Sequence, residues 1–131
     1  MELYVFDASR RPAGVVESFE YLRWTRRYSQ CGSFELKAIA TAENLALLTL
    51  GNILWKSGGE EAGIIEYAEI SQEEKELITV SGRFAVSYLA RRIVWDTEIL
   101  NGTLADCAGQ LINNHLISPG NTDRRMDFIA Y

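Results

Sequence analysis

Residues 1–83 show short stretches of apolar–polar alternation separated by polar turns, which is the pattern of an antiparallel β domain. Ser33–Ile39 alternates most clearly, with apolar side chains on one face and Glu35 and Lys37 on the other. The aromatic-rich segment Phe19–Tyr28 precedes it across a tight polar connection, so we predict that the two segments pair as an antiparallel hairpin. Further strands are predicted at Leu3–Phe6, Asn52–Lys56, Ala62–Ile70 and Glu76–Val80.

Two segments outside this alternation have clear helix-start signals. Thr41 is a favourable N-cap and Glu43 suits the first turn, so a short helix is predicted over 42–49. Thr103 followed by Asp106 resembles a capping box, and apolar residues then repeat at helical spacing. We therefore predict a second helix over 103–115.

The segment Ser81–Trp95 marks the change from strands to helices. A helix is predicted over about 84–91 because apolar positions recur at i, i+3, i+4 and i+7, namely at Val86, Leu89, Ala90 and Ile93. We interpret this segment as a plug that closes a β-barrel and leads into the C-terminal part of the chain. Gly82 lies where a strand must turn into this helix, which predicts either a positive φ or close backbone packing at that position.

Composition narrows the class of protein. The chain has 131 residues, 47% of them hydrophobic, which is enough for one domain or for one domain and part of a second. The formal net charge of −5 argues against a protein held mainly by nucleic-acid phosphates. No apolar run has membrane-spanning length, and no signal peptide is expected at the start. Cys31 and Cys107 are expected to be free thiols.

The chain offers little catalytic or metal-binding chemistry. His115 is the single histidine and lies near the predicted end of the last helix, so we interpret it as a helix-end residue. Cys107 is about 12 Å away along the helix axis, too far for a Cys–His pair. Glutamates between residues 60 and 76 lack the spacing of a calcium loop and are interpreted as a solvated face. We predict no enzyme activity, no catalytic, cofactor-binding or metal-binding residues, and no cofactor.

Paired arginines are the most specific polar feature of the chain. Neighbouring side chains on a strand point to opposite faces, so one arginine of the pair Arg26–Arg27 is expected to point inward or into an interface. Acidic side chains of a neighbouring copy would then be suitable partners, although ordinary surface charge explains the pairs equally well. The candidate interface residues are Arg26, Arg27, Glu66, Glu69, Arg91 and Arg92.

Several segments in order carry a resemblance to a known family. They are Trp24–Leu36 (WTRRYSQCGSFEL), Thr41–Leu45 with Leu47 and Leu48, Gly51–Leu54, Gly63–Glu66, Val80–Arg83, Tyr88–Ile93 and Trp95. Together they look like the N-terminal part of siphophage tail-hub proteins, the minor tail or baseplate proteins of the tail tip, which also occur in prophages. The likeness covers roughly residues 1–115.

The resemblance implies a mainly β fold with minor α content, an antiparallel small β-barrel followed by short helices. It implies a β-barrel hub domain over 1–95 and the start of a second, mixed α/β lobe over 96–131. Such hubs are typically trimers in which two barrels per subunit form a ring between the tail tube and the tip. The implied partners are other hub copies and the distal tail and tail-tube proteins, with no nucleic acid and no membrane. The implied location is the virion tail, assembled in the bacterial cytoplasm.

Two other classes of protein remain open from the residues alone. A stand-alone small β-barrel that binds an oligonucleotide or small ligand would use Phe19, Tyr21 and Trp24 as a stacking surface. A small hydrolase would need two carboxylates facing one cleft, and the sequence does not identify such a pair. Exposure of the three aromatic side chains distinguishes the first class from a hub protein.

Overall fold

The chain folds as two compact units, residues 1–86 and residues 87–131. The computed structural model describes residues 2–72, 74–91, 94 and 97–126. The domain boundary predicted at residues 95 and 96 lies outside the described residues. We describe each unit by itself.

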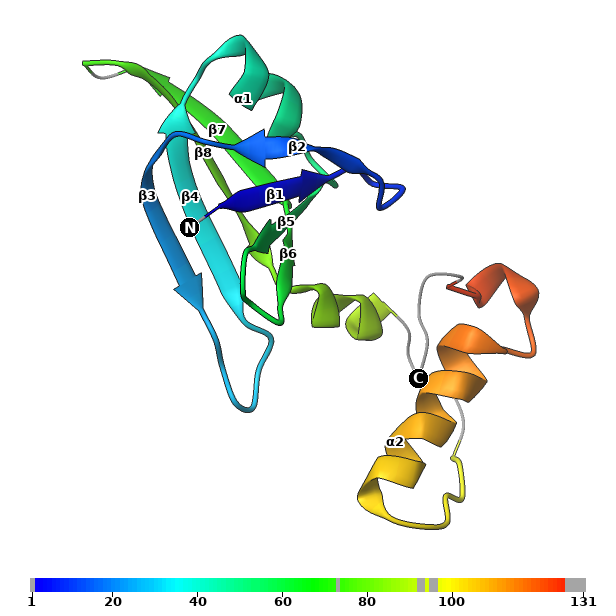
Figure 1. Ribbon diagram of the computed structural model, residues 1–131. Helices are drawn as coiled ribbons and strands as arrows, with labels where there is room; N and C mark the ends of the chain where they lie inside the picture. Colours follow the sequence, from blue (N-terminus) through cyan, green and yellow to red (C-terminus); the bar gives the residue numbers. More distant parts are fainter. Residues whose placement is uncertain (1, 73, 92–93, 95–96, 127–131) are drawn as a thin grey trace. The chain divides into compact units, whose positions relative to one another are not determined.

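Unit 1 consists of two four-stranded antiparallel sheets (Figure 1). The first sheet has the order β2-β1-β5-β6, formed by Pro12–Val16, Leu3–Phe6, Ile53–Lys56 and Ala62–Ile64. The second sheet has the order β3-β4-β8-β7, formed by Phe19–Thr25, Ser33–Ile39, Glu76–Arg83 and Tyr67–Gln72. The mainly β prediction is confirmed, as is the hairpin of β3 and β4, in which Leu22 faces Leu36.

The predicted single strand Ala62–Ile70 is wrong, because the chain changes sheets in its middle. β6 pairs with β5 in the first sheet, whereas β7 pairs with β8 in the second. Ile65 lies at the break and is 1% exposed, and its N–H donates to the Asn52 carbonyl at 2.9 Å. The next N–H, of Glu66, donates to the Ser81 carbonyl of β8 at 2.9 Å. The Ile65 N–H is therefore paired with the residue just before β5 of the first sheet, and the Glu66 N–H with β8 of the second sheet.

Among the described residues the two sheets do not close into a single barrel. Each sheet ends in strands that pair with another strand on one side only, β2 and β6 in the first and β3 and β7 in the second, apart from one bridge made by β6. One isolated bridge, Gly63 with Phe84, joins β6 to the chain just after β8. The architecture is a two-sheet sandwich whose strands cross, with corners where the chain passes from one sheet to the other (Figure 1).

The hydrophobic core lies between the inner faces of the two sheets. Alternate side chains of β4 and β8 point into it, so the face of the second sheet that carries Leu36, Ala38, Ile78 and Val80 is its core face. The predicted short helix is confirmed as α1, Ala42–Leu47, with the Thr41 hydroxyl accepting from the Asn44 N–H at 3.1 Å. Other core residues are Leu3, Val5, Val16, Phe34, Leu48, Leu54, Ile65 and Phe84.

The prediction that residues 84–91 form a helix is confirmed, as a 3₁₀ helix over Ala85–Arg91. The plug interpretation is not supported, because Val86 and Leu89 of its apolar stripe are exposed at 56% and 37% while Ser87 is buried. Ile93 lies outside the described residues. A 3₁₀ helix has three residues per turn, so an i, i+4 stripe calculated for an α-helix does not form one face.

Unit 2 is built around α2, Leu104–Ile112, which continues as a π-helix over Asn113–Ile117. The predicted capping box is confirmed: the Thr103 hydroxyl accepts from the Asp106 N–H at 3.2 Å, and the Asp106 carboxylate accepts from the Thr103 N–H at 3.1 Å. A short 3₁₀ helix follows at Thr122–Arg124. In the described part of the chain no helix has the length and apolarity to cross a membrane.

Candidate functional site

Strand β7 is exposed on both of its faces. Tyr67 and Ile70, which point to opposite faces, are each 55% exposed. In the register with β8, Ala68 faces Val80 and Ile70 faces Ile78, so both β7 residues lie on the core face of the second sheet. Their counterparts on β8 are buried, whereas Ala68 and Ile70 are exposed. The core face of the second sheet thus extends beyond the part that the first sheet covers.

The backbone edges of β7 and β3 are open. They are the two outermost strands of the second sheet, and no described backbone group outside that sheet hydrogen-bonds to residues 67–72 or 19–25. In Figure 1, β3 lies at the left of the second sheet, and the β7–β8 hairpin extends toward the upper left of the view. An open strand edge presents unpaired N–H and C=O groups that can pair with another chain.

The outer face of these two strands carries opposite charges. On β3, Arg23 forms an ion pair with Glu35 at 3.3 Å, and its side chain is 62% exposed. On β7, the Glu69 carboxylate accepts a hydrogen bond from the Tyr67 hydroxyl at 3.2 Å. This hydrogen bond, together with the negative charge of Glu69, raises the pKa of the Tyr67 phenol above its ordinary value. The outer face thus carries a basic side chain, Arg23, on β3 and an acidic side chain, Glu69, on β7.

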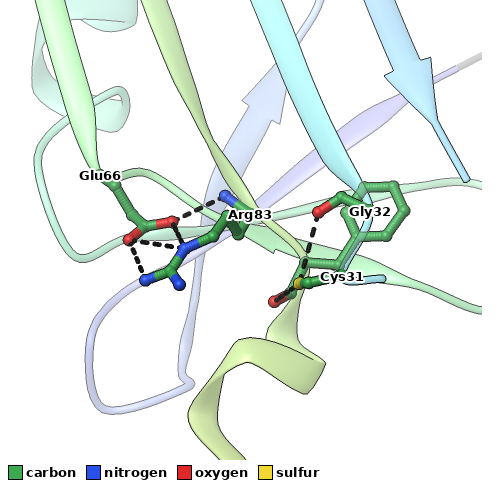
Figure 2. Close-up of polar contacts among 5 residues, drawn as sticks. Cys31, Gly32, Glu66 and Arg83 are labelled. Atoms are coloured by element: carbon green, nitrogen blue, oxygen red, sulfur yellow. Dashed lines mark hydrogen bonds and ion pairs between the residues drawn. The ribbon is translucent and has the colours of Figure 1, made fainter. Parts of the chain in front are cut away.

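The corner between β6 and β7 is held by a two-pronged ion pair (Figure 2). The Arg83 backbone N–H and side-chain Nε donate to one Glu66 carboxylate oxygen at 2.8 and 3.0 Å, and Nη2 donates to the other at 2.9 Å. The hydrogen bonds and the charge of Glu66 raise the pKa of the Arg83 guanidinium. This contact ties the start of β7 to the end of β8, so it positions the exposed strand.

The arginine pair Arg26–Arg27 lies at the rim of a cavity of about 350 Å³ at the end of unit 1. Arg26 Nε lies 2.6 Å from a Glu61 carboxylate oxygen, and Arg27 donates to the Gln30 side-chain oxygen at 3.0 Å. Phe84 contributes to the apolar wall of this cavity. The two arginines at the cavity rim are thus engaged by side chains of the same chain.

Several of the six predicted interface residues have contacts within the chain, in the part that the structure describes. Glu66 is held by Arg83, and Arg91 lies over the Tyr88 ring with its guanidinium carbon 4.4 Å from the ring centroid. Arg92 lies outside the described residues. Glu69 lies on β7, an outermost strand of the second sheet. The contact of these six residues with a neighbouring copy stays a prediction.

The two cysteines are free thiols in the described structure, as predicted. The Cys31 thiol donates to the carbonyls of Gly32 and Phe84 at 3.4 and 3.5 Å (Figure 2). Those contacts tie the loop after β3 to the chain leaving β8. Within the described ranges, no group of three or more His, Cys, Asp or Glu side chains is placed to hold a metal ion.

Sequence reasoning missed a partner for His115. Its Nε2 lies 2.5 Å from a Glu98 carboxylate oxygen, and the two side chains are 12% and 24% exposed. Glu98 Oε2 and His115 Nδ1 are buried, and neither has a hydrogen-bond partner among the residues that the structure describes. The pair joins the segment before α2 to the helix end, so His115 has a structural role inside unit 2.

We expect His115→Ala to destabilise unit 2 by about 1–3 kcal/mol, because a mostly buried carboxylate loses its hydrogen-bond partner. Asn114→Ala, a change at an exposed neighbouring position, serves as the control. Amide hydrogen exchange resolved to peptides of residues 97–117 measures the effect. Equal protection in the two variants would contradict the structural role.

The aromatic side chains do not form an exposed stacking stripe. Phe19 and Trp24 are partly buried and pack against the core. The Trp24 ring centroid lies 5.8 Å from that of Phe34 and 4.8 Å from that of Phe84. Tyr21 alone of the three predicted stacking residues is exposed. This arrangement disfavours an oligonucleotide-binding module, which needs several exposed ring faces.

Residues 2–131 match the family model described as Siphovirus ReqiPepy6 Gp37-like protein. No curated protein sequence shows significant similarity to the chain.

Proposed function

The chain belongs to the Siphovirus ReqiPepy6 Gp37-like family, and from this premise we propose that it is a non-enzymatic structural component of a phage or prophage tail tip or baseplate hub. Family membership makes it a siphophage protein, which indicates a structural part of the virion. In this proposal unit 1 takes the place of a ring-forming barrel domain of the hub. Residues 96–131 are then the start of a second lobe.

The observation that carries the proposal is the exposure of β7 along its open edge and on both faces. A monomeric protein normally protects such a strand, because an open apolar edge promotes association. Here Glu66 and Arg83 hold the strand in place, while Ile70 and Tyr67 remain exposed. A fixed, exposed strand edge suits a protein whose role is to assemble with neighbours.

The proposed partners follow from the hub role. They are other copies of the chain in a ring, trimeric in the hubs that it resembles, together with the distal tail and tail-tube proteins. The proposed location is the virion tail after assembly in the host cytoplasm. The alternative, a stand-alone binding module for an oligonucleotide or small ligand, is disfavoured by the packing of Trp24 into the core and by the net charge of −5.

Labelling of purified virions tests the proposal. An epitope tag inserted beside Gly58, in the exposed turn between β5 and β6, should place gold-labelled antibody at the tail tip of intact particles. Particles from the untagged phage are the control. Disruption of the gene should give particles without a completed tip. Label on the capsid, or absence of the protein from purified tails, would contradict the proposal.

A further inference from the structure

The direction of the backbone groups on the two open edges can be read from the ladder between β4 and β8. The Ala40 N–H donates to the Glu76 carbonyl and the Phe84 N–H donates to the Gly32 carbonyl, each at 2.9 Å. Both bonds follow the register in which Ala38 faces Ile78. Backbone groups of successive residues on an antiparallel strand point alternately to the two sides. The backbone N–H and C=O groups of even-numbered residues on β4 and β8 therefore point toward each other. Those of odd-numbered residues point toward β3 from β4 and toward β7 from β8.

The same alternation fixes which groups point outward. Odd-numbered residues of β3 and β7 pair inward, in the registers where Arg23 faces Glu35 and Glu69 faces Thr79. The N–H and C=O groups that point away from the sheet then belong to Leu22 and Trp24 on β3 and to Ala68 and Ile70 on β7. These four residues also have their side chains on the core face of the second sheet.

We propose that β7 of one copy pairs antiparallel with β3 of a second copy, with Ile70 opposite Leu22 and Glu69 opposite Arg23. Strands β7 and β3 run in opposite directions within one sheet, because three antiparallel pairings separate them. If two copies lie side by side in the same orientation, β7 of one copy is therefore antiparallel to β3 of the next. This proposal deepens the proposed function and rests on it only for where in the virion the copies meet.

Three features of the register agree with one another. The outward-pointing backbone groups of β7 meet those of β3, so the N–H and C=O groups on both edges gain hydrogen-bond partners. The partly exposed apolar side chains of Ile70 and Leu22 meet on the core face of the second sheet. A second copy would there cover apolar surface that the first sheet leaves exposed. Glu69 and Arg23 meet on the outer face, and an opposite-charge cross-strand pair is stabilising.

Pairing of β7 with β7 of a second copy is the main competing arrangement. In the register that places Ile70 opposite its own copy, Glu69 would face Ser71, so the charge complementarity is lost. That arrangement also leaves the β3 edge open. A β7–β3 contact instead uses a different surface on each copy, and repetition of such a contact produces a ring or a filament rather than an isolated dimer.

Charge reversal in the full chain tests the pairing. Glu69→Arg and Arg23→Glu should each raise the self-association Kd roughly five- to tenfold, as expected for about 1 kcal/mol per like-charged pair. The double variant should restore the Kd of the wild type. Val15→Lys, on an edge strand of the first sheet, is the control and should not change it. Sedimentation velocity over a concentration series gives the Kd. Weakening by Glu69→Arg but not by Arg23→Glu would overturn the proposal in favour of β7–β7 pairing.

Disulfide trapping tests the contact where association is weak. In a chain with Cys31→Ser and Cys107→Ala, Arg23→Cys combined with Glu69→Cys should give a ladder of crosslinked species beyond the dimer. The two positions cannot bridge within one chain, because three strand spacings of about 4.8 Å separate their strands. Arg23→Cys combined with Val15→Cys is the matched control. Absence of the ladder overturns the pairing, whereas a ladder from a protein that is absent from phage tails overturns only the proposed function.

Discussion

Gly82→Ala is expected to prevent stable folding of unit 1, with a loss in the free energy of unfolding of more than about 4 kcal/mol. A Cβ atom at this position would overlap the Ile64 carbonyl oxygen and lie 2.9 Å from its carbon and 3.1 Å from the Glu66 nitrogen. These are backbone atoms at the corner between β6 and β7, so no side-chain rotation relieves the clash. Both strands would have to move away from β8.

Gly120→Ala is the matched control, because a Cβ atom there would have no neighbour within 4 Å. Urea unfolding of both variants, followed by far-ultraviolet circular dichroism, measures the effect. We expect the Gly120 variant to unfold like the wild type, and the Gly82 variant to lack the cooperative transition of unit 1. A Gly82 variant with an unchanged midpoint would show that the corner adjusts at little cost.

The prediction for Gly82 shows what a sequence can establish by itself. A glycine at the end of an apolar strand, just before bulky residues, indicated close packing, and the structure confirms that alternative rather than a positive φ. The N-cap of α1 and the capping box of α2 were also predictable. In each case the signal and the structure lie within a few residues, so local chemistry decides the outcome.

The change of sheet at Ile65 and Glu66 was not predictable in the same way. The segment from Ala62 to Ile70 has apolar residues throughout, and its pattern does not distinguish one long strand from two strands in different sheets. What breaks the strand is hydrogen bonding to Asn52 on one side and to Ser81 on the other. Those partners are remote in sequence and become neighbours only in the folded unit.

The candidate interface was only partly predictable for a related reason. Ala68 and Ile70 are two residues apart and so share one face of a strand, but no sequence pattern shows that the first sheet stops before covering them. The sequence also drew attention to Arg26, whose partner in the structure is Glu61 of the same chain. The contact between His115 and Glu98 joins a helix to a segment that has no hydrophobic periodicity, so no sequence pattern predicted it.

The segment after β8 yields the second prediction of large effect. We expect Phe84→Ala to destabilise unit 1 by about 3–5 kcal/mol, as for other buried phenylalanines. Phe84 is 4% exposed, and its ring centroid lies 4.8 Å from that of Trp24. The ring lies so close to Gly32 that a Cβ atom on that glycine would be 2.5 Å from it. Removing the ring would leave a cavity between the β3–β4 loop and the end of β8.

Val86→Ala is the matched control, because the two residues lie on the same segment and Val86 is 56% exposed. Its substitution should change the free energy of unfolding by no more than about 0.5 kcal/mol. Urea titrations followed by tryptophan fluorescence report on the loss of Phe84 directly through its neighbour Trp24. If Phe84→Ala is the more destabilising of the two substitutions, the Phe84 ring is what holds the segment after β8 in place. If Val86→Ala were instead the more destabilising change, the apolar side chains of Val86 and Leu89 would hold the segment in place. That result would contradict the role assigned to the Phe84 ring.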